Sequence, residues 1–202
     1  MIDLILDDCM NVMSKYNDNY FDLAIVDPPY GLDPKSMQGS GKLKNRILNT
    51  LDTSWDIAPN KEYFDELFRV SKNQIIFGGN YFINHLKSTR CFLIWDKKQF
   101  MPTFSACEFA WTSFYKPAKI FTQRGNFEKI HPTQKPIELY KWILHNYSNK
   151  GEKILDTHLG SGSIAIAAHY FGVDLVGIEI DEEYYNKAKK RIKMLTAQET
   201  LF

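Results

Sequence analysis

Short apolar runs alternate along the chain with segments in which apolar residues recur at helical spacing. The runs are too short for helices, and those at residues 4–6, 23–26, 74–77, 92–95, 108–111, 154–155 and 175–178 predict buried strands. The helical pattern covers residues 63–70, 137–147, 164–171 and 182–195. This alternation predicts an α/β domain with a mostly parallel sheet.

Residues 31–60 do not fit this alternation. They are rich in Gly, Lys, Asn, Ser and Thr and show no clear period. A loop of this length in a compact domain is usually functional or mobile. We therefore expect residues 31–60 to form a mobile active-site loop, because the segment begins directly after a motif described below.

Composition limits the class of protein. The 202 residues, 44% of them hydrophobic, suit one globular domain spanning residues 1–202. The net charge of +1 means that any nucleic-acid site must come from local clusters of Lys and Arg. Cys9, Cys91 and Cys107 lack metal-binding spacing, so we expect reduced thiols, no metal and a cytoplasmic protein. No apolar run has the length of a signal peptide or a membrane helix.

The first motif is Asp27-Pro28-Pro29-Tyr30, which directly follows an apolar run and so lies where ligands bind in open α/β sheets. The two prolines lack N–H groups, so the stiff backbone presents mainly carbonyl acceptors. An ionised Asp27 also offers only acceptors, and Tyr30 can stack on a flat base. The motif predicts a clamp for an amino group, in which the acceptors stabilise positive charge that develops on the nitrogen when it reacts. A rigid Pro-Pro turn is the alternative.

The second motif spans residues 156–181 and combines a strand, a Gly-rich turn, a helix and an acidic strand end. Gly160 and Gly162 permit a tight turn and close approach of the backbone to a ligand. Glu179 can hydrogen-bond the hydroxyls of a ribose, so the pattern predicts a site for an adenosine-containing cofactor. The turn also fits the G-x-G-x-x-A fingerprint, which leaves a permuted nicotinamide-dependent dehydrogenase or a purely structural turn as alternatives.

The third motif, residues 131–136, reads His-Pro-Thr-Gln-Lys-Pro and precedes a predicted helix. Thr133, Gln134 and Lys135 would place N–H donors and an ammonium near the helix N-terminus, an arrangement that binds anions such as a methionine carboxylate. An ordinary helix start is the alternative. The histidine is expected to be structural, because no nucleophile or metal ligand is indicated near it.

In their order along the chain, residues 27–30, 131–136 and 156–181, the three motifs resemble those of the beta group of DNA amino-methyltransferases. In that family the D-P-P-Y motif comes first and the cofactor motif last. Residues 131–136 match the family's H-P-T-Q-K-P motif completely. Residues 156–163 match its D-P-F-x-G-S-G-[ST] motif in part, with Thr157-His158 in place of Pro-Phe. Residues 177–179 are similar to its G-x-E strand end, and residues 6–9 to its G-D-C segment.

The resemblance implies a permuted Rossmann-like methyltransferase fold with a seven-stranded, mostly parallel sheet, its last strand antiparallel, and helices on both faces. It implies S-adenosyl-L-methionine as cofactor and DNA as substrate, with the target base flipped out of the duplex. Family members with Asp first in the catalytic motif mostly modify N6 of adenine, whereas Ser often marks N4 of cytosine. The implied catalytic residues are Asp27, Pro28, Pro29 and Tyr30. The implied cofactor-binding residues are Asp8, Cys9, Asp27, Thr133, Gln134, Lys135, Asp156, His158, Gly160, Ser161, Gly162, Ser163, Glu179 and Ile180.

Two segments are candidates for contacts with nucleic acid. Residues 114–130, called the basic segment below, interleave basic and aromatic residues and would form a minimal target-recognition segment. The loop at residues 31–60 would close over cofactor and base or contact phosphates. The basic residues expected to bind DNA are Lys35, Lys42, Lys44, Arg46, Lys116, Lys119 and Arg124. A solvated hairpin and a disordered surface loop are the alternatives.

Other functions remain open at this point. The same chemistry could serve cytosine N4, RNA or a protein amide, although Asp27 disfavours the protein substrate. The Thr157-His158 departure leaves room for a non-catalytic DNA-binding subunit that kept the fold. The resemblance suggests a homodimer and a role in restriction–modification.

Overall fold

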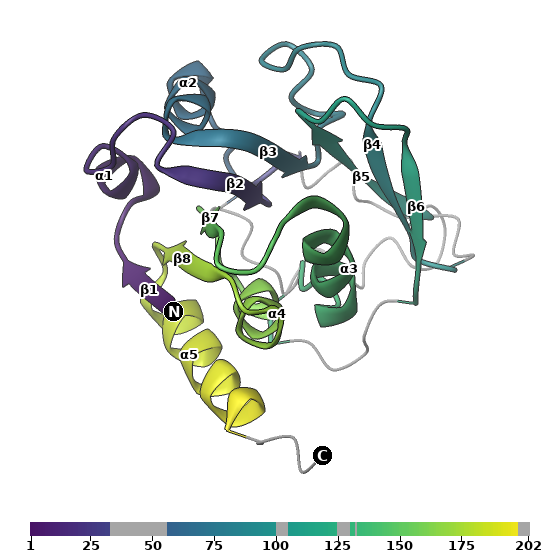
Figure 1. The fold of residues 1–202 in the computed structure, drawn as a ribbon. Coiled ribbons are helices and arrows are strands. Elements are labelled where there is room, and N and C mark those ends of the chain that lie inside the picture. Colours follow the sequence, from purple (N-terminus) through teal and green to yellow (C-terminus); the bar gives the residue numbers. More distant parts are fainter. Residues whose placement is uncertain (33–55, 100–104, 125–129, 132, 198–202) are drawn as a thin grey trace, which may run out of the picture.

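A computed structural model describes residues 1–32, 56–99, 105–124, 130–131 and 133–197. These residues form one mixed α/β unit, drawn in Figure 1. Its strands are β1 (Ile2–Leu6), β2 (Phe21–Val26), β3 (Ser71–Phe77), β4 (Phe92–Asp96), β5 (Cys107–Thr112), β6 (Lys119–Thr122), β7 (Lys153–Asp156) and β8 (Asp174–Glu179). Its helices are α1 (Cys9–Met13), α2 (Lys61–Val70), α3 (Ile137–Tyr147), α4 (Ser163–Phe171) and α5 (Glu182–Thr196).

The strands form a single sheet in the order β1-β8-β7-β2-β3-β5-β4-β6. Each neighbouring pair from β1 to β3 is parallel, whereas β5 runs antiparallel to both β3 and β4, and β6 is parallel to β4. The carboxyl ends of every described strand except β5 therefore lie along one edge of the sheet, called the carboxyl edge below. Because β5 runs the other way, its first residues lie at that same edge.

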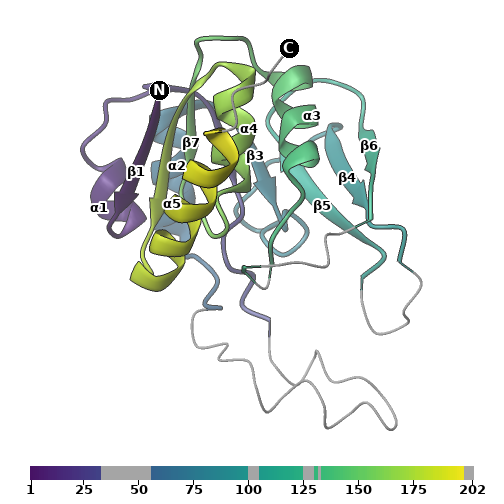
Figure 2. The ribbon, with the colours of Figure 1, turned by 90° about the horizontal axis from the view of Figure 1, so that it is seen from below.

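Helices cover both faces of the sheet. Helices α3, α4 and α5 pack side by side on one face, as Figure 2 shows, and share a core with residues of β2, β3, β4 and β7. Helices α1 and α2 cover the other face and pack on a second core. The core strands β2 and β7 are buried along most of their length, which explains why they appear in the sequence as apolar runs.

Local signals in the sequence fix where several helices begin. The side chain of Asn60 accepts a hydrogen bond from the backbone N–H of Tyr63 at 3.2 Å and caps α2. Asp181 caps α5 in the same way through the N–H of Tyr184, at 2.8 Å. Gly162 caps α4 at φ +70°, a left-handed conformation that favours glycine. The two caps at α4 and α5 start both helices beside the carboxyl edge.

The alternation of apolar runs and helical patterns is confirmed, with differences of a few residues at the ends of elements. Two elements were not predicted. Helix α1 has five residues, too few for a periodic pattern, and β6 is a partly exposed edge strand without an apolar run. The sheet has eight strands among the described residues rather than seven, because β6 extends it beyond β4, and the antiparallel strand is β5 rather than the last.

In the described part of the chain, no helix is long and apolar enough to cross a membrane. The same residues contain no group of three or more His, Cys, Asp or Glu side chains placed to hold a metal ion.

Candidate functional site

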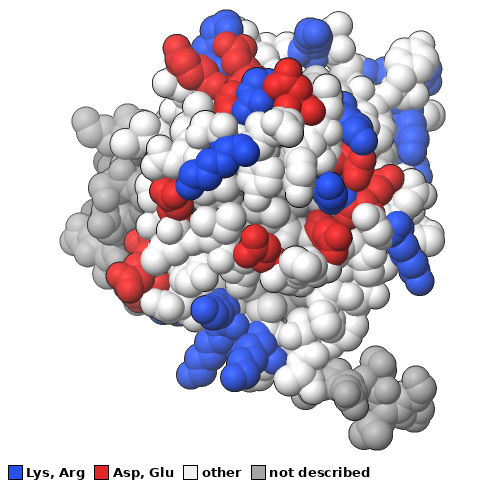
Figure 3. Space-filling view, turned by 60° about the vertical axis from the view of Figure 1, so that its left-hand side comes forward, with Lys and Arg blue, Asp and Glu red and all other residues white. Residues whose placement is uncertain are grey.

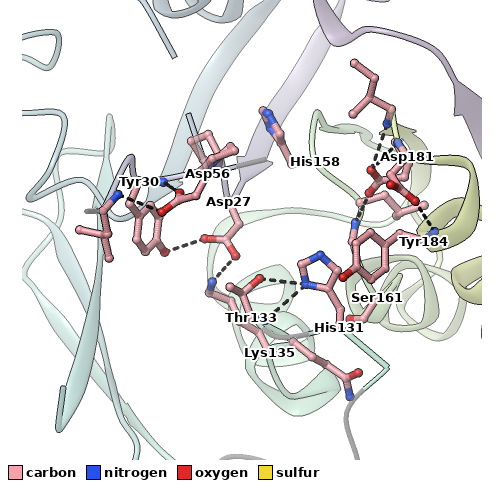
Figure 4. Close-up of a pocket in the computed structure, with 18 of the residues that line it drawn as sticks. Asp27, Tyr30, Asp56, His131, Thr133, Lys135, His158, Ser161, Asp181 and Tyr184 are labelled. Carbon is pink, nitrogen blue, oxygen red and sulfur yellow. Dashed lines mark hydrogen bonds and ion pairs between the residues drawn. The ribbon is translucent and has the colours of Figure 1, made fainter. Parts of the chain in front are cut away.

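A cavity of about 200 Å³ opens at the carboxyl edge of the sheet, and residues of all three sequence motifs line it. Residues 27–30 follow β2, residues 133–135 precede α3, residues 158–161 follow β7, and residues 179–181 include the last residue of β8 and the two after it. Figure 4 shows Asp27 and Tyr30 toward one end of the cavity and Asp181 and Tyr184 toward the other. The fold thus brings together segments more than 100 residues apart in sequence, as the sequence analysis expected of ligand-binding residues at strand ends.

The Asp27 carboxylate is held by two donors. The Tyr30 hydroxyl donates to Oδ1 of Asp27 at 2.7 Å, and the Lys135 ammonium donates to Oδ2. Each carboxylate oxygen can accept more than one hydrogen bond, so both keep capacity toward the cavity. The side chain is 15% exposed. Burial raises the pKa of Asp27 above its ordinary value, and Glu108 raises it further while Lys135 opposes the rise.

Tyr30 is fixed from both its ring and its backbone. Its ring stacks on that of Tyr81, with centroids 4.9 Å apart and an interplanar angle of 21°. Its N–H donates to Oδ1 of Asp56 at 2.8 Å, and the next two N–H groups, of Gly31 and Leu32, donate to the same carboxylate at 3.0 and 2.9 Å. Asp56 therefore anchors the chain where it leaves the first motif.

Lys135 has a role that the sequence did not predict. Its side chain is only 2% exposed, and its ammonium contacts Asp27 and lies 3.2 Å from Oε2 of Glu108. Burial lowers the pKa of Lys135, but the two carboxylates outweigh burial and raise it. The ammonium predicted to bind an anion is thus already paired with two carboxylates, and its part in cofactor binding stays a prediction.

The Gly-rich turn is closed by a carboxylate and a guanidinium. Oε2 of Glu179 accepts the N–H of Gly160 at 2.8 Å, and Oε1 accepts the N–H groups of Ile180 and Asp181, both at 3.0 Å. Burial raises the pKa of Glu179, and these backbone donors oppose the rise. From α5, Arg191 donates to the carbonyl oxygen of Ser161 at 2.7 Å. These hydrogen bonds fix the shape of the turn, and Glu179 stands in the cavity wall.

The Thr157-His158 pair, which departs from the family motif, is part of a buried hydrogen-bonded chain. The hydroxyl of Thr157 lies 2.9 Å from Nδ1 of His158 and 2.7 Å from the Tyr63 hydroxyl. Burial lowers the pKa of His158 to about 4, so the ring is neutral near pH 7. His158 lines the cavity, whereas Thr157 links it to Tyr63 on α2.

Asp156 lies beneath the cavity rather than in its lining. It is 3% exposed, and its Oδ1 accepts the N–H of His158 at 3.1 Å. Burial raises the pKa of Asp156 to about 8, with contributions from the negative charges of Asp27 and Glu179. The carboxyl group is therefore partly or wholly protonated near neutral pH.

The third motif folds back on itself before α3. The hydroxyl of Thr133 lies 3.0 Å from Nδ1 of His131, and the His131 ring packs edge-on against Tyr184 at 4.3 Å. The amide oxygen of Gln134 accepts the N–H of Ile130 at 3.0 Å. These contacts join the motif to α5. His131 lines the cavity as a packing group, consistent with the structural role expected for it.

Most of the residues expected to bind the cofactor line the cavity, but some do not. The supporting or more distant residues are Asp8, Cys9, Asp156, Gly162 and Ser163. Asp8 accepts the N–H of Met10 at 2.7 Å as the cap of α1. Burial raises the pKa of Cys9 to about 12, so its thiol stays neutral.

Several residues that line the cavity were not predicted from the sequence. They are Leu32, Asp56, Tyr140, Leu159, Asp181 and Tyr184. Asp181 could have been found from its position directly after the acidic strand end. Asp56 could not, because it follows a long polar segment without a pattern.

The residues expected to bind nucleic acid are placed only in part. Lys35, Lys42, Lys44 and Arg46, with most of the loop at residues 31–60, lie outside the described residues. Lys116 and Lys119 donate to the backbone carbonyl and the side chain of Asn146, at the far end of α3 from the cavity. Arg124 follows β6 and lies toward the carboxyl edge, so it alone among the described members of this set is near the cavity end of the sheet.

Charges of both signs are interspersed on the surface. Figure 3 shows acidic and basic side chains side by side over much of one face, with basic side chains gathered at its lower edge in that view. The formal net charge of +1 agrees with this mixture. On the described residues of that face, attraction of a polyanion would therefore depend on local clusters.

Comparisons with known proteins agree with the motifs. Residues 94–190 match the sequence profile of a family described as DNA methylase. The chain is 25% identical over 240 aligned positions to the type II methyltransferase M2.MboI of Moraxella bovis, which covers 93% of this chain and 86% of that protein. The resemblance drawn from the sequence is confirmed by these matches.

Solved structures show the same fold. M1.HpyAVI, solved as a SAM complex, is similar with a TM-score of 0.65 and 21% identity, covering 95% of this chain and all of that one. The PvuII DNA methyltransferase, described as cytosine-N4-specific, is similar with a TM-score of 0.65 and 11% identity, covering 98% and 92% of the two chains. The methyltransferase fold expected from the motifs is thereby confirmed.

Proposed function

We propose that the chain is a DNA methyltransferase of the N6/N4 type, like the proteins it resembles, and that it transfers a methyl group from S-adenosyl-L-methionine to the N6 amine of adenine in DNA. The observation that carries the proposal is the pairing of an acceptor clamp and an adenosine-type site in one cavity. Asp27 and Tyr30 form the first, and the Gly160 turn with Glu179 forms the second.

The residues at the second end of the cavity fit S-adenosylmethionine. Glu179 holds the Gly-rich turn through three backbone N–H groups and keeps lone pairs for ribose hydroxyls. Gly160, at φ +52°, leaves the turn open to a ligand, since the atoms nearest to an added Cβ would be those of the His131 ring, at 3.7 Å. Asp181 and Tyr184 complete this end, where the adenosine would lie. The cofactor supplies an electrophilic methyl group when bound.

At the first end, the chain's own residues would orient the amine. An aryl amine is a weak nucleophile because its lone pair is delocalised into the ring. A carboxylate of Asp27 that accepts an N–H of the amine stabilises the positive charge that develops on this nitrogen, and it can take up the proton that the nitrogen loses. Tyr81 stacks on one face of the Tyr30 ring, and the Tyr30 ring can also stack on the target base.

A base inside a duplex cannot reach these groups, because Asp27 is mostly buried. We therefore infer that the target base is flipped out of the helix, which costs a few kcal/mol of stacking and pairing. Adenine is proposed over cytosine because Asp27 is the first residue of the catalytic motif. Methylation of cytosine N4 is the second candidate, favoured by the likeness in fold to the PvuII enzyme.

The experiment that tests the proposal is methyl transfer from isotopically labelled S-adenosylmethionine to unmethylated DNA, followed by nucleoside mass spectrometry. We expect labelled N6-methyladenine. If labelled N4-methylcytosine is found instead, the substrate is cytosine, which is the second candidate. Cofactor binding without any methylated nucleoside would overturn a DNA-modifying activity of the isolated chain.

A further inference from the structure

A row of alternating charges runs from the cavity into the antiparallel part of the sheet. Tyr30 donates to Asp27, Lys135 contacts Asp27 and Glu108, and Lys97 donates to the second oxygen of Glu108 at 2.5 Å. The two acidic and two basic side chains balance in charge. Sequence motifs account for Asp27 and Lys135 only, so the outer half of the row has no role in the function described above.

The fold places Glu108 there by strand direction. Glu108 is the second residue of β5 and pairs with Trp95 near the end of β4. Because β5 is antiparallel to its neighbours, its amino end reaches the carboxyl edge, where Asp27 also lies. Lys97 follows β4 and is held by backbone pairing of its N–H to the Ala106 carbonyl at 3.0 Å. Regular structure therefore fixes both outer members.

The charges in this row are costly to bury. Lys135 is 2% exposed, Asp27 is 15% exposed and Glu108 is 23% exposed. An isolated buried ion costs several kcal/mol, and removal of one partner leaves the others uncompensated. A single carboxylate would suffice to neutralise Lys135. A second carboxylate on the same ammonium instead holds the ammonium in place between two fixed points.

We propose that Lys135 is a positioning residue for Asp27: its ammonium keeps Asp27 ionised and aimed at the amine, and Glu108 with Lys97 holds that ammonium in place, although the charge of Glu108 itself opposes the ionisation of Asp27. The proposal rests on the function proposed above for Asp27. The ion pairs of Lys135 are with Asp27 and Glu108 and not with Glu179 at the adenosine end of the cavity, so Lys135 acts on the amine through Asp27.

Several groups face Asp27 from the elements packed around it. Lys135 precedes α3 and Tyr140 lies on α3, Glu108 comes from β5, Asp156 ends β7, and Tyr63 comes from α2. Among these, Lys135 is the cation. Loss of Lys135 therefore removes the charge that favours ionised Asp27, whereas loss of Glu108 removes a charge that disfavours it.

The test is a direct titration of Asp27. The 13C resonance of its carboxyl carbon is followed against pH in protein labelled at aspartate, with the assignment made from the Asp27→Asn variant. In Lys135→Met the apparent pKa of Asp27 should rise by about one unit or more, and in Glu108→Gln it should fall, where one unit corresponds to a tenfold change in the ionisation equilibrium. Lys135→Arg should restore most of the original value.

The same variants are assayed for methyl transfer across pH, with Lys141→Met as the matched control. Lys141 lies on α3 and is 42% exposed, with Glu138 as its partner. The acid limb of the rate should follow Asp27, moving to higher pH in Lys135→Met and to lower pH in Glu108→Gln, while Lys141→Met leaves it in place. Binding of S-adenosylmethionine, measured by calorimetry, should change by less than about threefold, or below ~0.7 kcal/mol.

Four outcomes decide the proposal. Opposite shifts of the Asp27 titration in the two variants support it, even if wild-type protein yields no methylated nucleoside, in which case the proposed function alone fails. An unmoved titration in both overturns it. Loss of cofactor binding in Lys135→Met with an unmoved titration assigns Lys135 to the cofactor and overturns it. If Lys135→Met does not fold, Glu108→Gln decides alone: an Asp27 pKa that does not fall in this variant overturns the proposal.

Discussion

At the scale of single residues, Asp27 combines two tasks that are usually separate. It is the acceptor proposed for the substrate amine, and it is a counterion of the buried Lys135. A change at this position should therefore affect both chemistry and stability.

Asp27→Asn should lower the rate of methyl transfer by about 10²-fold or more, because it removes a fixed charge aimed at the reacting nitrogen. It should also lower the free energy of unfolding by roughly 1–3 kcal/mol, since Lys135 keeps Glu108 as a partner. Labelled-methyl transfer and guanidinium unfolding measure the two effects. Asp65→Asn is the control. Asp65 forms an ion pair with Lys61 on α2 and its side chain is 60% exposed, so this substitution should change neither the rate nor the stability. Normal turnover in Asp27→Asn would refute the clamp.

The raised pKa of Asp156 predicts that the free energy of unfolding depends on pH. Its pKa is raised from 3.8 to about 8, chiefly by burial, so the fold favours the protonated carboxyl. Stability from this group is complete below about pH 4 and is lost as pH rises toward 8, by at most about 1.4 kcal/mol per pH unit. Asp156→Asn keeps an acceptor for the N–H of His158 and cannot ionise.

The Asp156→Asn variant should therefore gain stability relative to wild type as pH rises from 5 to 7.5. Urea unfolding of both proteins at these two pH values measures the difference. Asp65→Asn serves again as the exposed comparison and should show no such gain. A stability difference that is the same at both pH values would mean that Asp156 is ionised in the fold throughout this range.

The position of a residue at the cavity could be predicted where a motif and a strand end coincide, and not elsewhere. Asp27, Gly160 and Glu179 lie in the cavity as the sequence indicated. The partner of Lys135 was missed because an ammonium before a helix has the same sequence pattern whether it faces a ligand or a buried carboxylate. Glu108 was missed because its strand runs antiparallel, so a rule based on carboxyl ends does not reach it.

At the scale of elements, the turn before α4 shows how one glycine joins the site to the core. Gly162 has φ +70°, and an added Cβ would lie 2.7 Å from Cδ1 and 3.0 Å from Cγ1 of Ile192 on α5. The same short turn carries Gly160 into the cavity wall. Close packing of α5 on α4 and the shape of the turn therefore depend on one another.

Gly162→Ala should destabilise the fold by about 1–3 kcal/mol through backbone strain and overpacking. Gly151→Ala is the matched control, because Gly151 also has a positive φ, +81°, but an added Cβ would meet nothing within 4 Å. It should show strain alone and therefore a smaller loss. Adding Ile192→Val to Gly162→Ala removes the Cδ1 methyl and should recover part of the difference. Equal losses at the two glycines, measured by guanidinium unfolding, would exclude the contact with α5.

Elements with strong burial were predictable, and elements without it were not. Strands β2 and β7 are buried over most of their residues and helix α3 matches its pattern at both ends, so periodicity found them. Strand β6 has only partly buried or exposed residues and exists because β4 offers a free edge. Pairing with a distant strand leaves no local period in the sequence.

At the scale of the whole molecule, the direction of the strands decides which charged residues can serve the cavity. Lys119 pairs with Leu93 at the start of β4, and Thr122 pairs with Asp96 at its end. Lys116 and Lys119 therefore lie toward the amino edge of the sheet, where both contact Asn146. Helix α3 spans about 15 Å between that contact and the motif before its first residue. The basic segment is thus divided between the two ends of the molecule.

This division leads to a prediction about DNA binding under the proposed function. Arg124 is exposed and lies beyond the end of β6, on the cavity side. Arg124→Gln should weaken binding to duplex DNA and reduce the slope of log affinity against log salt by about 0.9, the value for one phosphate contact. Fluorescence anisotropy over a range of salt concentrations measures the slope. Lys116→Gln and Lys119→Gln are the matched controls and should leave the slope unchanged, because a duplex seated on the cavity is far from them. If all three variants reduce the slope equally, DNA must extend along the β6 edge to the other end of the sheet, and the basic segment would then act as a whole, as its sequence first indicated.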